Sequence, residues 1–172
     1  MGETRRNTST TSPRTSRSAI ARRPGDPRRR DDRRRAWPGP VTSAGVLDTS
    51  VFIANESGRT LDDALIPDEV ATTAITVAEL HLGVLAASHS ETRAQRMATL
   101  ESVADMMALP ADDDAARMWA RLRIHLAETG GRVRINDLWI AAIANSRKLP
   151  VVTQDGDFDA LEGAAGLKII RV

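Results

Sequence analysis

The sequence predicts an α/β domain in which a parallel β-sheet is flanked by α-helices, behind a disordered N-terminal leader. Short apolar runs of strand length alternate along the chain with longer segments whose apolar residues recur at helical spacing. Such alternation is typical of a parallel sheet covered on both faces. The composition also changes abruptly between Pro40 and Val41. We therefore divide the 172-residue chain into a leader, residues 1–40, and one domain, residues 41–172.

The leader is rich in Arg, Ser, Thr and Pro and has too few apolar residues to bury a core. It holds 12 arginines and four acids, a net charge of +8, whereas the domain holds 12 basic and 19 acidic residues, a net charge of −7. Three interpretations stay open: a cationic arm that binds nucleic-acid phosphates, a solvated spacer, or a start assigned too early. The composition change lies just before the first strand, which favours a true start near Val41.

Five short runs have the length and composition of buried strands. Each is mostly apolar and is bounded by polar or turn-forming residues. They occupy residues 45–47, 70–73, 106–109, 151–153 and 168–172.

The segments between these runs are predicted to be helical. Thr76 to Glu79 fits a capping box at the start of the second helix. Gly130 and Gly131 stop the fourth helix. The predicted helices begin with a turn at 51–54 and continue with 76–85, 91–104, 112–128 and 136–147.

The composition excludes several classes of site and location. The chain has no cysteine, which removes disulfides, thiolate nucleophiles and Cys-ligated zinc. The three histidines share no spacing that suggests a site. No apolar segment approaches the roughly 20 residues of a membrane helix, and the basic N-terminus lacks the apolar core of a secretory signal. We expect a cytoplasmic protein with no membrane partner.

Four acidic residues interrupt apolar runs: Asp48, Glu79, Asp137 and Asp155. Asp48 and Asp155 both follow predicted strands, and ligands of open parallel sheets bind beyond the carboxyl ends of the strands. Asp137 shares a helix face with the apolar residues three and four positions on. Glu79 has Gly83 one turn later, where the absence of a side chain would let a ligand or backbone approach. The four carboxylates could therefore converge.

Each acid also has a structural explanation when it is taken alone. Asp48 could cap a helix, and Glu79 could complete the capping box. Asp137 could complement a helix dipole, and Asp155 could belong to a turn with Gly156. Only their shared position on one edge of the predicted sheet favours a functional site.

Convergence of four carboxylates predicts a metal site. Like charges held close together raise one another's pKa, and a bound divalent cation reverses that effect. One or two Mg²⁺ or Mn²⁺ ions, which take oxygen ligands, could hold a phosphate and activate a water that attacks a phosphodiester. Asp157 is either a further acid at this site or the cap of residues 158–161.

Four segments resemble, in the same order, the acidic motifs of PIN-domain ribonucleases. The spacing is similar to that of the VapC toxins of type II toxin–antitoxin systems, and the resemblance runs from about residue 45 to residue 172. The segments are residues 46–52 (VLDTSVF), 76–80 (TVAEL) with Gly83, 134–142 (RINDLWIAA) and 152–158 (VTQDGDF).

The resemblance implies a PIN-like (Rossmann-like) fold and an endoribonuclease that depends on Mg²⁺ or Mn²⁺. It implies cleavage of structured RNA such as tRNA or rRNA, a VapB-type antitoxin as partner, and a homodimer or a toxin–antitoxin hetero-oligomer. The catalytic and metal-binding quartet of the family carries over to Asp48, Glu79, Asp137 and Asp155. Asp157 is similar to an accessory acid of the family.

Further residues would support that quartet. The resemblance implies that Thr49 or Ser50, together with Thr153, supplies hydroxyls to the metal shell or the phosphate. It also implies that Asn136 orients the third acid. Because the domain is acidic, local basic residues must also contact the RNA backbone, and Arg132 and Arg134 are the candidates. Solvated charge on a loop explains these two arginines equally well.

Two other functions compete with this one. A catalytically inactive PIN-fold module that binds RNA or protein is the first, and the intact acid set argues against it. A phosphatase of the haloacid type also begins with an Asp after its first strand. That chemistry needs a second Asp two residues on, where this chain has Ser50.

Overall fold

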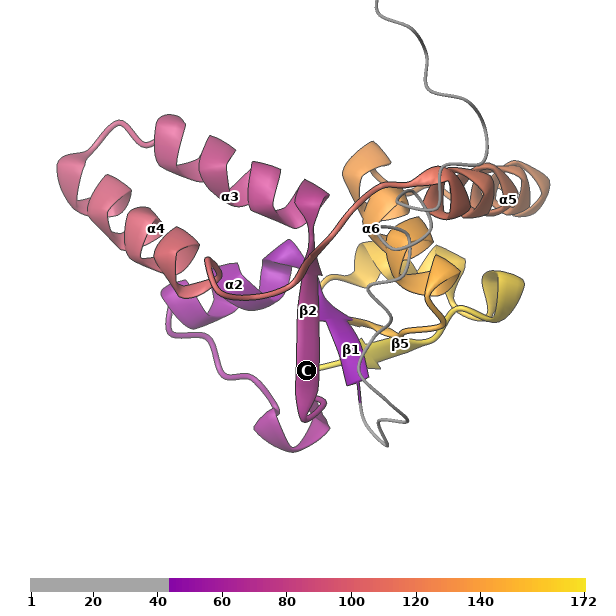
Figure 1. Cartoon of the computed structure of the whole chain (residues 1–172), viewed down its shortest axis with the longest axis horizontal. Coiled ribbons are helices and arrows are strands. Elements are labelled where there is room, and N and C mark those ends of the chain that lie inside the picture. Colours follow the sequence, from indigo (N-terminus) through magenta and orange to yellow (C-terminus); the bar gives the residue numbers. More distant parts are fainter. Residues whose placement is uncertain (1–43) are drawn as a thin grey trace, which may run out of the picture. The chain divides into compact units, whose positions relative to one another are not determined.

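The computed structural model describes residues 44–172 of the chain. The predicted leader and the first three residues of the predicted domain lie outside the described residues. The described part contains five parallel strands in the order β3-β2-β1-β4-β5, so the predicted parallel sheet is confirmed (Figure 1). The strands are β1 Ala44–Leu47, β2 Glu69–Thr73, β3 Ala108–Leu109, β4 Val151–Thr153 and β5 Ile169–Arg171.

The helices lie close to the predicted segments. In Figure 1, α2, α3 and α4 gather on one side of β2, and α5 and α6 on the other. The α-helices are α2 Thr49–Glu56, α3 Ala74–Leu85, α4 Ser90–Ser102, α5 Asp113–Thr129 and α6 Ile135–Ser146. Three short 3₁₀ helices, η1 Asp63–Leu65, η2 Gly156–Leu161 and η3 Ala164–Gly166, complete the described elements. Among residues 44–172, no helix is both long and apolar enough to cross a membrane.

The centre of the sheet determines where the acids lie. β1 pairs with β4 in parallel, with Leu47 opposite Val152. The two strands therefore end side by side, and the residues that follow them start from the same edge of the sheet. Val46, Val151 and Val152 are completely buried, as apolar residues of a central parallel strand should be.

The predicted capping box of α3 is wrong. The helix begins earlier than predicted, because Thr73 at the end of β2 keeps an extended backbone and caps it. The Thr73 Oγ1 accepts a hydrogen bond from the Thr76 amide at 3.0 Å. Glu79 is therefore not needed at the helix start, and its carboxylate is available for contacts elsewhere.

The glycine of α3 has a different neighbour from the one that the sequence suggested. The side chain of Arg96, on α4, lies 3.7 Å from where a Cβ of Gly83 would be. The Arg96 Nη1 donates to the Gly83 carbonyl at 2.7 Å. The space at Gly83 thus serves the packing of α4 against α3.

The α5–α6 pair forms the second part of the core. Leu122 and Leu126 of α5 and Ile140 and Ile143 of α6 are all nearly inaccessible to solvent. α5 ends at Thr129, and the left-handed φ of 72° at the following Gly130 agrees with the predicted stop.

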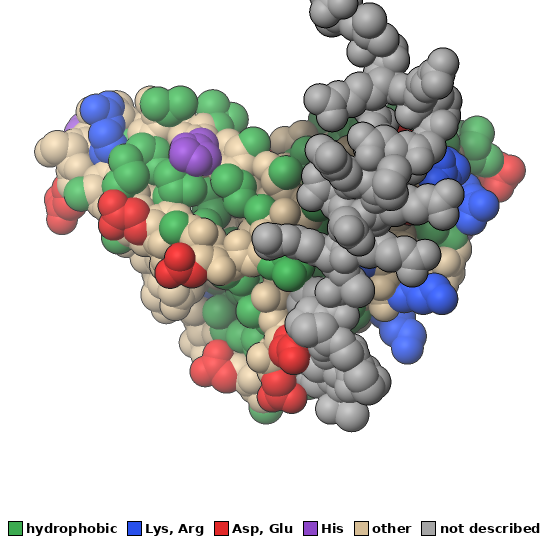
Figure 2. All heavy atoms as spheres, in the orientation of Figure 1, with side chains coloured by type: hydrophobic (Ala, Val, Ile, Leu, Met, Phe, Trp, Pro, Cys, Tyr) green, Lys and Arg blue, Asp and Glu red, His purple; other side chains and the backbone are tan. Residues whose placement is uncertain are grey.

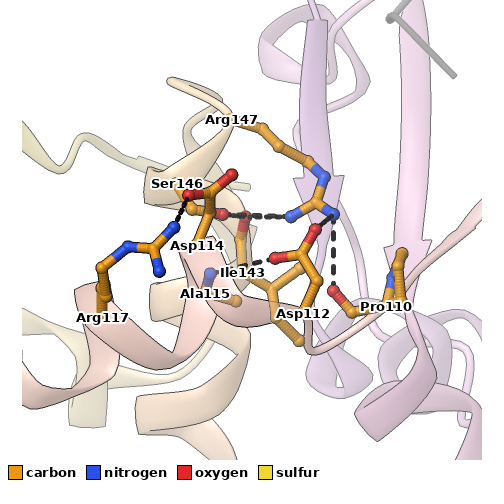
Figure 3. Close-up of polar contacts among 8 residues, drawn as sticks. All are labelled: Pro110, Asp112, Asp114, Ala115, Arg117, Ile143, Ser146 and Arg147. Carbon is orange, nitrogen blue, oxygen red and sulfur yellow. Dashed lines mark hydrogen bonds and ion pairs between the residues drawn. The ribbon is translucent and has the colours of Figure 1, made fainter. Parts of the chain in front are cut away.

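Arg147, at the end of α6, ties the two helices together (Figure 3). Its Nη2 contacts the Asp112 Oδ2 at 3.0 Å and the Pro110 carbonyl at 3.4 Å. Asp112 in turn caps α5 by accepting from the Ala115 amide at 3.0 Å. Arg147 is therefore engaged in contacts within the fold. Arg132 and Arg134 remain the candidate arginines for ligand binding.

Candidate active site

Asp48 both caps a helix and belongs to the candidate site. It follows β1, is 3% exposed, and accepts a hydrogen bond from the Ser50 amide at 3.2 Å, which caps α2. The Thr153 hydroxyl, at the end of the neighbouring β4, donates to the same Asp48 Oδ2 at 2.9 Å. Burial raises the pKa of Asp48, although the hydrogen bonds from Ser50 and Thr153 oppose the shift. The structural and functional interpretations of this residue are thus compatible.

Asp137 is the most perturbed acid of the site. It lies in the first turn of α6 and is 7% exposed, and its Oδ2 is buried with no hydrogen-bond partner within residues 44–172. Burial, followed by the negative charges of Asp48 and Glu79, raises its pKa to about 7. The charge of Asp155 also raises this pKa, whereas the Arg134 guanidinium lowers it.

The pKa of Asp137 responds to the charges of the other three acids. Asp48 comes from the end of β1, Glu79 from α3 and Asp155 from the end of β4, yet all three lie close enough to Asp137 to disfavour its ionisation. The structure therefore places Asp48, Glu79 and Asp155 within electrostatic range of Asp137. Such a cluster is electrostatically unfavourable unless a cation is present.

Glu79 is held by side chains from two other helices. The hydroxyl of Thr49, at the start of α2, donates a hydrogen bond to the Glu79 Oε2. The side-chain amide of Asn136, at the start of α6, donates to the Glu79 Oε1 at 2.8 Å. Asn136 was expected to orient the third acid, but its hydrogen bond goes to the second. These two contacts fix the Glu79 carboxylate between α2, α3 and α6.

The hydroxyls of Ser50 and Thr153 belong to a chain of hydrogen bonds that reaches Asp48. The two oxygens are 3.0 Å apart. Ser50 Oγ accepts from the Gln154 amide at 3.0 Å, and Thr153 Oγ1 accepts from the Asp155 amide at 2.9 Å. The completely buried Thr153 hydroxyl thus holds both Asp48 and the start of the following segment, and its predicted contact with a metal or phosphate stays a prediction.

Asp155 and Asp157 begin the 3₁₀ helix η2. The Asp155 Oδ1 accepts from the Asp157 amide at 3.0 Å, so the predicted turn role of Asp155 is present together with its place in the cluster. The Asp157 carboxylate forms an ion pair with the Arg134 Nε at 3.2 Å. Arg132 lies in the loop between α5 and α6.

Sequence reasoning missed Arg171, the last residue of β5. Its guanidinium donates to the Asp155 carbonyl and to the Asp159 carboxylate, so it fixes the start of η2. Arg171 lies opposite Thr153 in the sheet. Nothing in the sequence gives the register of β5 against β4, and so the neighbourhood of Arg171 and Asp155 could not be predicted.

The donor set of the site fits a hard divalent cation. Within residues 44–172, no three His, Cys, Asp or Glu side chains are arranged to hold one metal ion between them as they stand. The donors around Asp137 are nonetheless all oxygens, which Mg²⁺ and Mn²⁺ take. The buried Asp137 Oδ2 has no partner among the described residues, as expected of an atom whose partner is a ligand.

Comparisons with known proteins find relatives over most of the described part of the chain. A family model described as PIN domain matches residues 45–164. The chain is 76% identical over 130 residues to Ribonuclease VapC5 of Mycobacterium tuberculosis, a match that covers 76% of this chain and 96% of the relative. It is 39% identical over 116 residues to Ribonuclease VapC4 of the same organism, covering 67% of this chain and 89% of the relative.

A solved structure is similar over much of the chain. The crystal structure of VapBC-5 from M. tuberculosis, a member of the VapBC family of toxin–antitoxin systems, superposes with a TM-score of 0.72 at 73% identity. The match covers 76% of this chain and 99% of that chain. The DNA-bound VapBC of Salmonella typhimurium matches with a TM-score of 0.61 at 26% identity, covering 74% of this chain and 97% of that one.

Proposed function

The chain belongs to the PIN-domain family, as a member of its VapC branch, and on that premise we propose that it is a toxin that cleaves structured RNA with the help of Mg²⁺ or Mn²⁺. The relatives that are named ribonucleases support RNA as the substrate. One observation carries the proposal: the buried Asp137, with an unpartnered oxygen, lies within electrostatic reach of three further carboxylates. tRNA and rRNA are the structured RNAs that we expect it to cut.

Four carboxylates hold the cation in this proposal. Asp48, Asp137, Asp155 and Glu79 are the residues that would hold it, since the charges of the other three act on Asp137. A divalent cation bound there supplies positive charge to the scissile phosphate and lowers the pKa of a bound water. Asp157 stands at the edge of the set, paired with Arg134.

The remaining side chains keep the four acids in place. Thr153 holds the carboxylate of Asp48, and Thr49 and Asn136 hold that of Glu79 from two sides. Fixed carboxylates cost little reorganisation when the reaction begins, which is how preorganised sites lower barriers. Arg132 and Arg134, which precede α6, are the side chains that we expect to contact RNA phosphates.

An antitoxin of the VapB type is the proposed partner. Both solved structures described above are of VapBC proteins, and the M. tuberculosis one belongs to the VapBC family of toxin–antitoxin systems. Hydrophobic side chains gather over α3 and α4 in Figure 2, and Leu82 and Leu85 of α3 are 64% and 79% exposed. Exposed apolar surface of this kind marks sites where proteins associate. We propose a toxin–antitoxin hetero-oligomer or a homodimer that acts in the cytoplasm, where its RNA substrates are.

RNA cleavage with and without metal tests this function. The full-length protein is incubated with total bacterial RNA in Mg²⁺ or in EDTA, beside Asp48→Asn as an inactive control. We expect discrete RNA fragments only from the unchanged protein in Mg²⁺. Equal fragmentation in Mg²⁺, in EDTA and by Asp48→Asn would contradict the proposal, because cleavage would then need neither the cation nor this carboxylate. RNA binding without cleavage under every condition would favour the inactive RNA-binding module instead.

A further inference from the structure

An ion pair joins the two segments that carry the third and fourth acids. Arg134 is the residue immediately before α6, and Asp157 lies inside η2. Their Nε and Oδ2 atoms are 3.2 Å apart. The two side chains are 73% and 39% exposed, so both remain within reach of a large ligand.

The guanidinium of Arg134 also acts on the centre of the site. It is the basic group that lowers the pKa of Asp137, against the four influences that raise it. Asp157, for its part, follows Asp155 by two residues and donates its amide to the Asp155 carboxylate at 3.0 Å. The pair therefore lies at the exposed rim of the acidic cluster.

We propose that Asp157 occupies, in the RNA-free protein, the position on Arg134 that a backbone phosphate of RNA takes in the complex. This inference rests on the proposed ribonuclease function. A guanidinium binds a carboxylate and a phosphate through the same planar set of donors, so one anion can replace the other. Asp157 then holds the Arg134 side chain in place at the rim before RNA binds. In this inference Asp157 is not a cation ligand.

The exposure of the pair makes this exchange feasible. Exposed ion pairs are weak, because water screens them and two long side chains must be held in place. RNA therefore loses only a small part of its binding free energy in displacing Asp157. Removal of the Asp157 carboxylate should therefore lower the Kd for RNA by about two- to fivefold, which corresponds to the free energy of a weak exposed ion pair.

RNA binding measured without cleavage tests the exchange. The full-length protein is titrated into a fluorescein-labelled RNA hairpin in EDTA, and fluorescence anisotropy gives the Kd at several salt concentrations. We expect Asp157→Asn to lower the Kd by about two- to fivefold. We expect Arg134→Ala to raise the Kd and to reduce the slope of log Kd against log salt by about one unit.

Two further variants separate the exchange from a change of net charge. Glu162→Gln makes the same charge change at the exposed residue that follows η2, and it should leave the Kd close to that of the unchanged protein. The double variant Arg134→Ala/Asp157→Asn should bind RNA like Arg134→Ala alone, because no guanidinium is left to release.

Three results would overturn the inference. The first is a gain from Glu162→Gln equal to that from Asp157→Asn, and the second is a gain that persists without Arg134. The third is an unchanged Kd for Asp157→Asn together with a higher Mg²⁺ requirement for cleavage, which would make Asp157 a cation ligand. In all three cases the unchanged protein still cleaves RNA. An unchanged protein that neither binds nor cleaves RNA would instead overturn the proposed function, and this inference with it.

Discussion

Asp137→Asn is expected to lower the rate of RNA cleavage in Mg²⁺ by at least about 100-fold, comparable to the loss of one preorganised contact to the transition state. The physical reason is the position of Asp137 among the carboxylates of Asp48, Glu79 and Asp155. An amide in its place has nearly the same shape but carries no charge to hold a cation. Single-turnover cleavage of a labelled RNA measures the chemical step directly.

Asp113→Asn is the matched control for this substitution. Asp113 also lies in the first turn of a helix, α5, but it is exposed. Its replacement makes the same chemical change in the same turn of a helix and should leave the cleavage rate nearly unchanged. Equal rates for the two variants would mean that Asp137 contributes only to the helix and not to the reaction.

The same substitution of Asp137 should stabilise the metal-free protein at alkaline pH. The pKa of Asp137 is about 7 in the folded chain, against 3.8 as the ordinary value. Between these values the folded protein holds a proton that the unfolded chain has lost, so the free energy of unfolding falls as the pH rises from about 4 to 7. Above pH 7 the ionised carboxylate costs the folded state on the order of 2 to 4 kcal/mol.

Because an amide side chain at this position cannot ionise, Asp137→Asn should not lose this part of the free energy of unfolding at high pH. In EDTA at pH 8 the variant should melt on the order of 10 °C above the unchanged protein. The difference should be smaller at pH 5 and should vanish only below about pH 4, where the carboxyl is protonated in the unfolded chain as well as in the folded protein. Calorimetric melting curves at both pH values check this. A variant that is less stable than the unchanged protein at pH 8 would contradict a strained, uncompensated carboxylate at this position.

The parallel sheet, and the position of acids at the carboxyl ends of its strands, could be predicted from sequence because both depend on local patterns. Apolar runs indicated the strands, and Asp48 and Asp155 follow two strands that do lie side by side. Asp137 could be placed on an inward helix face, since the residues three and four positions on are apolar and buried. Each of these inferences needed only the spacing of apolar residues along the chain and the parallel direction of the strands.

Contacts between distant elements could not be predicted. Thr73 and Thr76 are both acceptable helix caps, and only the end of β2 decides between them. Asn136 precedes Asp137, yet its amide donates to Glu79, 57 positions earlier in the chain. Arg171 reaches Asp155 only because β5 pairs with β4 in one particular register. Such partners depend on packing between elements, which no local pattern contains.

Binding of Mn²⁺, followed by electron paramagnetic resonance, tests most directly whether the four acids form one cation site. The unchanged protein at pH 8 should bind Mn²⁺, and Asp48→Asn, Glu79→Gln, Asp137→Asn and Asp155→Asn should each weaken that binding by at least about tenfold. Asp113→Asn should bind as the unchanged protein does. Binding that survives the loss of Asp137, or no binding by the unchanged protein, would contradict the assignment of these carboxylates to a metal-dependent active site.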